Sequence, residues 1–452
     1  MISSASVIGL GKLGASMAAC FAGADIKTIG VDINPASVEA VNAGLAPVEE
    51  TGLAQYIAEN KQNLSATLSY DDAVAATDAT FVIVPTPSEA HGGFSLAYAK
   101  EAFAKIGRAL TKKDGYHIVV MTSTVLPGGT EFGLLPILEQ ESGKKCGPDF
   151  GLCYSPEFIA LGSVIKDFLS PDFVLIGEVD DRSGAALEAF YQQVCINNPP
   201  AARMSIANAE LTKMSVNSFM TMKISFANML AGLCDRIPGG DVDNVTSALA
   251  MFGGATKSLK GGLGYGGPCL PRDNVALSYF ADSVGYETGI PLSVDGFNRS
   301  LGDRVAEKAM SCLSGSEKVT VLGLAYKPGT WVVEESQGVS IAKSLADRGF
   351  EVTVHDPLAL ENAQNVLRDV VTYEADLASA VEGANLVIVT TLDDAYAGLP
   401  AMAKVMSHNA SVLDVWRRFA QTDMAENDVT LVSLGLGEKN KANIDAVSAL
   451  AS

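Results

Sequence analysis

The chain has 452 residues, of which 48% are hydrophobic and 19% are charged, and its formal net charge is -20. This composition is typical of a globular protein of two or three domains with a large core. The negative charge argues against nucleic acid or an anionic membrane as the main partner.

Other counts narrow the class of protein. The first residues enter a strand-like run at once, so no signal peptide is expected, and no long apolar run predicts a membrane span. Seven cysteines without a C-x-x-C pair favour a reducing cytoplasm over a disulfide framework. Four histidines, far apart in sequence, argue against a metal site.

A glycine turn opens the chain. The run V-I-G-L-G-K-L-G has the spacing G-x-G-x-x-G, and Asp32 ends the next strand-like run, 18 residues beyond Gly14. The glycines permit a tight turn, close approach of a pyrophosphate and close packing of helix on strand, while the acid binds a ribose and repels a 2′-phosphate. The pattern therefore predicts a Rossmann half that binds NAD rather than NADP. The expected contacts are Gly9, Gly11, Lys12, Leu13, Gly14 and Asp32.

Apolar runs at 79–88, 116–130, 150–158 and 170–177 are typical of parallel strands buried on both faces. We expect the last of them to be the final strand of this half. Ligands bind at the carboxyl edge of such sheets, where the sequence places Pro85, Thr86, Thr124 and Glu157. Taken alone, Thr124 could equally cap a turn, and Glu157 could be a solvated carboxylate.

The segment between Pro200 and Pro238 contains no proline and predicts a helix that could span roughly 45 Å. Such a length suits a bridge between domains or a dimer interface. Lys213 and Asn217 are four residues apart, hence on one face. A lysine in so apolar a helix needs a partner or a task, although its ammonium group could also reach solvent past the apolar surface.

The run G-G-L-G-Y-G-G-P-C-L-P-R-D, residues 261–273, places Cys269 among glycines and prolines. The following segment is helical in pattern, so Cys269 should precede a helix N-terminus, a position that favours a reactive thiolate. The alternative is an ordinary buried cysteine in a glycine turn.

A third section repeats the first. Strand, helix and strand patterns occur at 317–327, 340–350 and 351–357, with further strands at 384–391 and 410–416. The distance from Gly323 to Asp356 is about ten residues longer than that from Gly9 to Asp32, and G-x-G-x-x-G is absent. This half should bind a nucleotide differently, with Lys327 as a candidate phosphate contact.

These patterns predict an α/β chain of two Rossmann-like, doubly wound parallel sheets joined by a long central helix and a helical middle region. The expected domains are 1–200, 201–300 and 301–452. We expect a cleft between the halves, lined by Lys213, Asn217 and Cys269.

The chain resembles the UDP-glucose/GDP-mannose dehydrogenase family along nearly its whole length. The matching runs are V-I-G-L-G-K-L-G, S-T-V-L-P-G-G-T, S-P-E-F, A-E-L-T-K-M-S-V-N-S-F, G-Y-G-G-P-C-L-P-R-D and L-G-L-A-Y-K-P. The resemblance implies a homodimer and a four-electron oxidation, in which two NAD convert the C6 alcohol of a sugar nucleotide to a carboxylate without releasing the aldehyde.

The resemblance also implies residue roles. Cys269 matches the nucleophile that forms a thiohemiacetal and then a thioester. Lys213 and Asn217 match the pair that holds the oxyanion. Asp273, with Thr124, matches the group that positions a water, and Glu157 matches the acid associated with thioester hydrolysis. The implied substrate contacts are Glu157, Phe158, Lys213, Asn217, Lys260, Tyr265, Gly266, Cys269, Lys327 and Arg417, and Arg272 joins the cofactor contacts.

Three positions depart from the family pattern. Leu161 replaces an acid, Gly253 stands where an arginine reaches the neighbouring subunit's sugar, and Glu334 replaces an arginine. Arg272, Arg417 and Arg418 could compensate for Glu334. The L-P-R-D ending is closer to the GDP-mannose branch.

Several hypotheses about the substrate and the function remain compatible with the sequence. The default substrate is UDP-glucose, with a UDP-N-acetylhexosamine or GDP-mannose next. A two-electron dehydrogenase of the hydroxyacid type would need neither Cys269 nor the 317–416 half. An inactive NAD- or nucleotide-sensing protein would explain Leu161 and Glu334 but not the intact Cys269, Lys213, Asn217 and Asp273.

Overall fold

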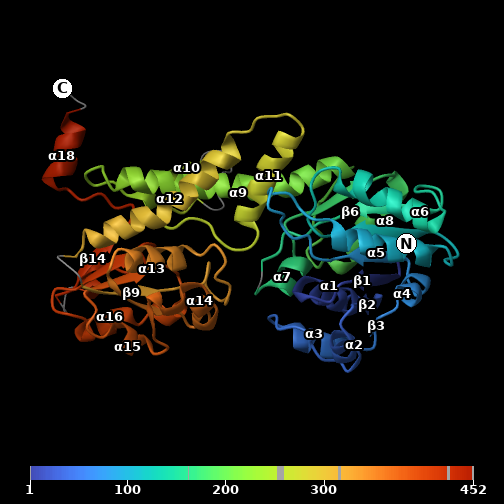
Figure 1. The fold of residues 1–452 in the computed structure, drawn as a ribbon, viewed down its shortest axis with the longest axis horizontal. Coiled ribbons are helices and arrows are strands. Elements are labelled where there is room, and N and C mark those ends of the chain that lie inside the picture. Colours follow the sequence, from blue (N-terminus) through green and yellow to red (C-terminus); the bar gives the residue numbers. More distant parts are fainter. Residues whose placement is uncertain (1, 161, 252–258, 314–316, 425–427, 450–452) are drawn as a thin grey trace. The chain divides into compact units, whose positions relative to one another are not determined.

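The computed structural model describes residues 2–160, 162–251, 259–313, 317–424 and 428–449. It divides into two compact units, residues 1–215 and 216–452, and Figure 1 shows the elements of each. The division falls inside helix α9, Ile206–Cys234. The three-domain boundaries expected from sequence stay a prediction.

The first unit contains an eight-stranded sheet in the order β3-β2-β1-β4-β5-β6-β7-β8. All neighbours are parallel except β6 and β7. The strands are β1 Ser4–Ile8, β2 Lys27–Val31, β3 Leu64–Thr67, β4 Ala79–Val82, β5 His117–Met121, β6 Phe150–Tyr154, β7 Val174–Glu178 and β8 Ala201–Ser205. The doubly wound fold is confirmed, with one antiparallel join.

The expectation that 170–177 holds the last strand of this half was wrong. Strand β8 follows and pairs parallel with β7, in a stretch that the sequence pattern assigned to the long helix. Its residues A-A-R-M-S are only partly buried at the sheet edge, so they lack the continuous apolar run that marks the other strands.

Helices cover both faces of this sheet. They are α1 Lys12–Gly23, α2 Pro35–Asn42, α3 Leu53–Asn60, α4 Tyr70–Ala76, α5 Ala97–Leu110, the π-helix η1 Gly129–Leu134, α6 Leu135–Ser142, α7 Val164–Leu169 and α8 Asp181–Val194. On one face the rings of Phe21, Phe81 and Phe190 pack with centroids 4.8 to 5.3 Å apart. Burial of such aromatic side chains contributes much of the stability of a core.

The second unit contains a six-stranded sheet in the order β11-β10-β9-β12-β13-β14, with every neighbour parallel. The strands are β9 Lys318–Leu322, β10 Glu351–His355, β11 Thr372–Tyr373, β12 Leu386–Val389, β13 Ser411–Asp414 and β14 Thr430–Ser433. The covering helices and turns are α13 Gln337–Asp347, α14 Leu360–Leu367, η2 Arg368–Val370, α15 Leu377–Val381, η3 Asp394–Tyr396, α16 Leu399–Met402, η4 Ala403–Val405 and α17 Gln421–Met424.

Helices of the middle region belong to the same unit. They are the second part of α9, α10 Val242–Met251, α11 Leu270–Ser283 and α12 Ile290–Met310, and α18 Lys441–Ser448 ends the described chain. The segment after β14 pairs with the start of α10, where Val242 N–H donates to Gly435 O at 2.9 Å. This pairing ties the second sheet to α10, which precedes the loop that contains Cys269 (residues 261–269, the cysteine loop).

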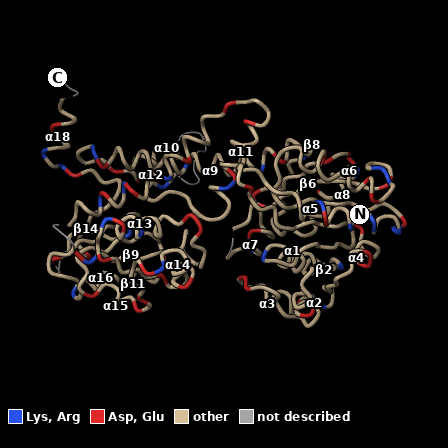
Figure 2. Tube along the Cα trace, in the orientation of Figure 1, with Lys and Arg blue, Asp and Glu red and all other residues tan. Residues whose placement is uncertain are grey.

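Charged residues occur along both units (Figure 2), and acidic residues are the more numerous. In the part of the chain that the structure describes, no helix is both long and apolar enough to cross a membrane.

Candidate active site

The turn between β1 and α1 has the geometry that the glycine spacing predicts. Gly9 has a φ of +97°, and a Cβ there would lie 2.1 Å from Ile83 O. A Cβ on Gly14 would lie 1.9 Å from Gly9 O, whereas one on Gly11 would meet nothing within 4 Å. Two glycines are therefore required by packing, and the third leaves open space at the start of α1 where a pyrophosphate fits.

Asp32 lies directly after β2 and is partly exposed. One carboxylate oxygen accepts from Leu10 N–H at 2.6 Å, and the other accepts from Asn34 N–H at 2.8 Å. Each oxygen can accept more than one hydrogen bond. The side chain is thus fixed against the glycine turn and retains acceptor capacity for a ribose hydroxyl.

The ends of β4 and β5 bring the predicted threonines together. Thr86 Oγ1 donates to Thr124 O at 2.8 Å, and Ser123 Oγ donates to Val84 O at 2.6 Å. Pro85 lies exposed beside them. These loops meet at the carboxyl edge of the sheet, as expected for cofactor contacts in this fold.

Lys213 is almost fully buried and lies against the S-P-E-F run. Its Nζ donates to Glu157 O at 2.5 Å and sits 4.4 Å from the centre of the Phe158 ring. The partner and the cation–π contact explain how the apolar helix accommodates the charge. Burial raises the pKa of the Glu157 carboxyl to about 7, against the opposing effects of the Lys213 charge and a Tyr191 hydrogen bond.

Glu210 is a site residue that sequence reasoning missed. It is buried on α9, and its two oxygens accept from Gly128 N–H at 2.6 Å and Thr130 N–H at 2.8 Å. It therefore fixes the S-T-V-L-P-G-G-T loop, which carries Thr124, to the helix that carries Lys213. Burial raises the pKa of this carboxyl to about 7. Its position three residues before Lys213, on the same helix face, could have revealed it.

In the second unit, Asn217 contacts Asp273. Asn217 Nδ2 donates to Asp273 Oδ2 at 2.5 Å, and Arg272 Nε lies 3.3 Å from Asp273 Oδ1. Asp273 is buried on the first turn of α11, so the amide and the guanidinium group compensate for its burial. Cys269 is the N-cap residue of α11, the position that the sequence predicts. Its side chain is exposed.

Two asparagines fix the backbone of the cysteine loop. Asn228 of α9 accepts from Gly262 N–H at 2.7 Å and donates to Leu263 O at 2.8 Å. Asn298 of α12 accepts from Tyr265 N–H at 2.9 Å and donates to Tyr265 O at 2.9 Å. These pairings give the glycine-rich loop a single backbone path despite its intrinsic freedom.

The connection between β9 and α13 also packs against this loop. Gly267 N–H donates to Glu334 O at 2.9 Å. A Cβ on Gly266 would lie 2.4 Å from Glu335 O, and one on Gly267 would lie 2.7 Å from the Tyr326 ring. Glu334 thus contacts the loop through its backbone while its side chain is exposed.

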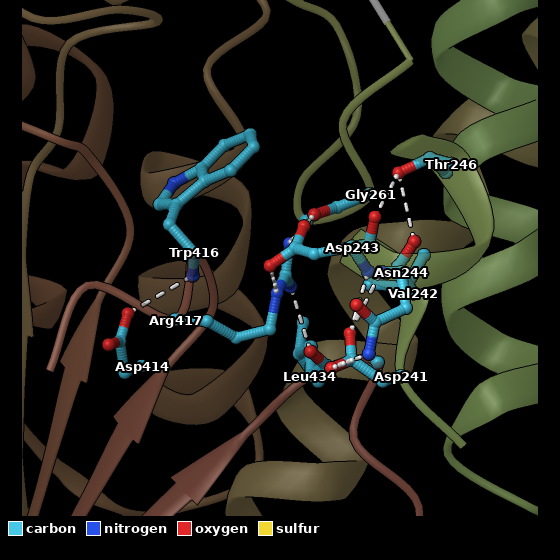
Figure 3. A network of polar contacts seen from close by, with 12 residues as sticks. Asp241, Val242, Asp243, Asn244, Thr246, Gly261, Asp414, Trp416, Arg417 and Leu434 are labelled. Atoms are coloured by element: carbon cyan, nitrogen blue, oxygen red, sulfur yellow. Dashed lines mark hydrogen bonds and ion pairs between the residues drawn. The ribbon is translucent and has the colours of Figure 1, made fainter. Parts of the chain in front are cut away.

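Arg417 has a different environment from the one expected of a substrate contact (Figure 3). Its guanidinium donates to both oxygens of Asp243 at 2.7 and 2.9 Å. The other donors reach Gly261 O at 2.7 Å, Leu434 O at 2.8 Å and Val415 O at 3.3 Å. All five N–H groups are directed at protein acceptors, and the side chain is 6% exposed. In this structure Arg417 holds the start of the cysteine loop; its contact with substrate stays a prediction.

Other predicted residues lie in the second unit. Tyr265 is buried, and its hydroxyl accepts from Asn274 Nδ2 at 3.0 Å. Lys260 is exposed, and Lys327 Nζ lies 5.7 Å from the centre of the Tyr326 ring. Arg418 donates to Asp393 O at 2.6 Å. The two other departures from the family pattern, Leu161 and Gly253, lie outside the described residues.

Over the described ranges, no group of three or more His, Cys, Asp or Glu side chains is arranged to hold a metal ion. The glycine turn, the fixed acid after β2 and the threonine edge define an NAD-dependent dehydrogenase of the Rossmann class.

Comparisons with known proteins identify the family. The chain matches the three domain models of the UDP-glucose/GDP-mannose dehydrogenase family, namely the NAD binding domain over 3–195, the central domain over 207–300 and the UDP binding domain over 320–421. The chain belongs to this family and is an NAD-dependent nucleotide-sugar 6-dehydrogenase.

Individual relatives agree with this assignment. The UDP-glucose 6-dehydrogenase AglM of Haloferax volcanii is 35% identical over 400 residues, 87% of this chain and 92% of that protein. The GDP-mannose 6-dehydrogenase of Azotobacter vinelandii is 37% identical over 358 residues, 78% of this chain and 80% of its own length. A UDP-glucose dehydrogenase structure from Pyrobaculum islandicum has a TM-score of 0.83 at 35% identity, covering 97% of both chains.

Proposed function

We propose that the protein oxidises the C6 hydroxyl of UDP-glucose to the carboxylate in two NAD-dependent steps, with Cys269 as the covalent nucleophile. The observation that carries the proposal is the exposed Cys269 thiol at the N-cap of α11, on a loop fixed by Asn228 and Asn298. A fixed nucleophile holds the intermediate aldehyde in attack geometry.

NAD, when bound by the β1–α1 turn and Asp32, accepts one hydride in each oxidation. Asp273, with Thr124, positions the water that takes the proton of the C6 hydroxyl in the first step. The Cys269 sulfur then bonds to the aldehyde carbon, and Lys213 and Asn217 stabilise the resulting oxyanion. Removal of one such donor typically costs 10²–10³ in rate.

The second oxidation converts the thiohemiacetal to a thioester on Cys269. Water then adds to the thioester carbon and the sulfur leaves as thiolate, which gives the carboxylate. Glu157 serves as the base for this water. Its pKa of about 7 suits an acid that gains and loses a proton near neutral pH.

The proposed substrate is inferred from two kinds of relative. AglM and the Pyrobaculum protein favour UDP-glucose. The Azotobacter protein, at 37% identity, favours GDP-mannose as the second candidate, as does the L-P-R-D ending. A UDP-N-acetylhexosamine is the third candidate.

A substrate panel tests the proposal. Purified protein and NAD are mixed separately with UDP-glucose, GDP-mannose, UDP-GlcNAc, UDP-GalNAc, UDP-ManNAc and 6-phosphogluconate. We expect two NADH per UDP-glucose consumed and no free aldehyde. One NADH per turnover, or released aldehyde, would contradict the four-electron route, and no turnover with any compound would favour a sensor.

The nucleophile has its own test. Cys269→Ala should abolish formation of the acid while NAD binding persists, because the thiol lies at the N-cap of α11 and the glycine turn lies in the other unit. Full activity of this variant would overturn the assignment of Cys269.

We also propose a homodimer in a reducing cytoplasm, supplying uronic acid for polysaccharide synthesis. Phe219, Phe226, Met229 and Leu233 form an apolar stripe on α9 and are 40 to 59% exposed, which supports association through this helix. The seven cysteines are free thiols. Light scattering should give a dimer for the wild type and a monomer for Phe226→Asp; a wild-type monomer would refute the dimer.

A further inference from the structure

Two buried hydroxyl groups extend in series from the Glu157 carboxylate. Tyr191 OH of α8 is 3.4 Å from Glu157 Oε1, and Ser155 Oγ is 3.0 Å from Tyr191 OH. Ser155 Oγ is also 2.9 Å from Leu175 O of β7. Tyr191 and Ser155 are only 3% and 1% exposed. The four groups form a continuous chain from the carboxylate into the core.

The other groups around Glu157 do not replace this chain. Lys213 contacts the backbone oxygen of Glu157 and contributes its charge. Cys20 of α1 and Cys195 after α8 interact electrostatically with the carboxylate, and burial raises the pKa of both thiols, that of Cys195 to about 12. Burial likewise raises the pKa of Tyr191. These three groups are therefore neutral near pH 7, and their hydrogens can serve only as hydrogen-bond donors.

The chain can satisfy Glu157 in both charge states. When the carboxyl is protonated, it donates to Tyr191, Tyr191 donates to Ser155, and Ser155 donates to Leu175 O. When the carboxyl is ionised, Tyr191 rotates its hydrogen to donate to Glu157, and Ser155 donates to Tyr191. Hydroxyl hydrogens rotate to suit their partners, so the change needs no movement of heavy atoms.

We propose that Tyr191 and Ser155 are positioning residues for Glu157, and that their reversible hydroxyl chain holds its carboxyl in place in both protonation states during thioester hydrolysis. The inference rests on the role of Glu157 in the proposed function. Neither hydroxyl touches the reacting atoms; both act through the carboxylate. A buried carboxylate without such a donor favours its neutral form.

The first experiment measures the carboxyl group directly. Infrared difference spectra of the full-length protein are recorded across pH, and the C=O stretch of protonated Glu157 is identified by its loss in Glu157→Gln. In Tyr191→Phe the midpoint should rise by about one pH unit, because the donor to the charged form is lost. Ser155→Ala should raise the infrared midpoint by a smaller amount. This variant also keeps the test possible if Tyr191→Phe fails to fold.

The second experiment measures hydrolysis. Single-turnover decay of the thioester is followed against pH, and the acid limb in Tyr191→Phe should move upward by the same amount as the infrared midpoint. Tyr116→Phe is the matched control, because the buried Tyr116 hydroxyl has no hydrogen-bond partner among the described residues; its profile should match the wild type.

The outcomes separate the two claims. An unchanged infrared midpoint in both Tyr191→Phe and Ser155→Ala overturns the hydroxyl chain, even if Glu157→Gln blocks hydrolysis. Unchanged hydrolysis in Glu157→Gln refutes the role of Glu157 in the proposed function, and the positioning inference falls with it. A shifted midpoint together with a shifted acid limb supports both.

Discussion

Asp32 and Asp356 occupy equivalent positions in the two halves of the chain. Each directly follows the strand that comes after the glycine turn and its helix, β2 in the first half and β10 in the second. Asp32 accepts two backbone hydrogen bonds and is partly exposed. Asp356 accepts four, from Leu324 and Ala325 at 2.7 and 2.9 Å and from Leu358 and Ala359 at 2.9 and 2.7 Å, and is 5% exposed. The first acid retains acceptor capacity for a ligand, whereas the second is saturated by the protein.

The glycines show what the two turns share. Gly323 has a φ of +106°, close to that of Gly9, and a Cβ on Gly338 would lie 2.1 Å from Gly323 O, as one on Gly14 lies 1.9 Å from Gly9 O. The second half therefore keeps the close packing of helix on strand without the G-x-G-x-x-G spacing. Its longer connection contacts the cysteine loop at Gly266 and Gly267. The first turn leaves open space at Gly11, whereas the connection after the second turn supports the backbone of the cysteine loop.

The largest expected effect is on the free energy of unfolding, which should fall much more when Asp356 is replaced than when Asp32 is replaced. Asp356→Ala leaves four backbone N–H groups without an acceptor, three of them in buried hydrogen bonds, and should cost at least about 3 kcal/mol of folding free energy. Asp32→Ala should cost about 1 kcal/mol, because it removes only two hydrogen bonds, of which the one from Asn34 N–H is exposed. Denaturant unfolding of the full chain measures both, and equal losses would contradict the difference in saturation.

The next effect is acid destabilisation of the first half. His117 is buried between Thr80 Oγ1 at 2.8 Å and Thr77 O at 3.0 Å, and burial lowers its pKa to about 4. The unfolded state binds a proton near pH 6.5, so the stability contribution is complete above that pH and is lost as the pH falls toward 4. The loss amounts to about 3 kcal/mol.

Hydrogen exchange, corrected for intrinsic rates, tests the difference between halves. Protection of β5 amides should fall between pH 7 and 5, and His117→Gln should remove that dependence. Burial also lowers the pKa of His355, which ends β10 in the second half and pairs with Leu322 of β9. The β9 amides therefore provide an internal comparison, because His117→Gln should leave their pH dependence unchanged. Equal pH dependence in both strands after the substitution would show that His117 is not the cause.

A smaller effect concerns cofactor affinity. Asp32→Asn removes the charge proposed to accept from a ribose hydroxyl, and the NAD dissociation constant should rise about tenfold, or 1.4 kcal/mol. Discrimination against NADP should weaken at the same time. Asp356→Asn is the matched control substitution. Calorimetry on the folded fraction of this variant should find an unchanged NAD affinity. An NAD affinity unaltered by Asp32→Asn would refute the ribose contact.

The smallest effect tests Glu210. Glu210→Gln retains one acceptor for the Gly128 and Thr130 N–H groups and loses the other, at a cost of about 1 kcal/mol. The rate of the first hydride step should fall several-fold because Thr124 is less well fixed, while binding of the sugar nucleotide should not change. Stopped-flow NADH absorbance measures the step, and weaker substrate binding with an unchanged step would contradict the role.

The sequence predicts most of the fold because its signals are local. Glycine spacing, apolar runs and the proline-free segment each determine one element from neighbouring residues. Strand β8 was missed because its side chains are only partly buried. Strands β3, β11 and β14 are short or partly exposed and give an equally weak pattern.

The candidate site residues differ in the same way: those in local sequence motifs could be predicted, and those that contact the site from far away in sequence could not. Cys269, Lys213, Asn217 and Asp273 lie in recognisable runs, and the structure adds a hydrogen bond between Asn217 and Asp273 that the sequence did not predict. Asn228 and Asn298 give no local signal, because each meets the cysteine loop from more than thirty residues away. The Asp243 partner of Arg417 is 174 residues away in sequence, so single-sequence reasoning could only treat that arginine as an available cation.

The enclosure of Arg417 also has a use in chemical labelling. A reagent selective for arginine needs an accessible guanidinium group, and this one is enclosed by Asp243, Gly261 and Leu434. Its labelling rate is therefore set by how often the start of the cysteine loop opens, and not by the reagent alone. Arg417 is a natural reporter through which the opening of this loop can be timed in the unmodified protein.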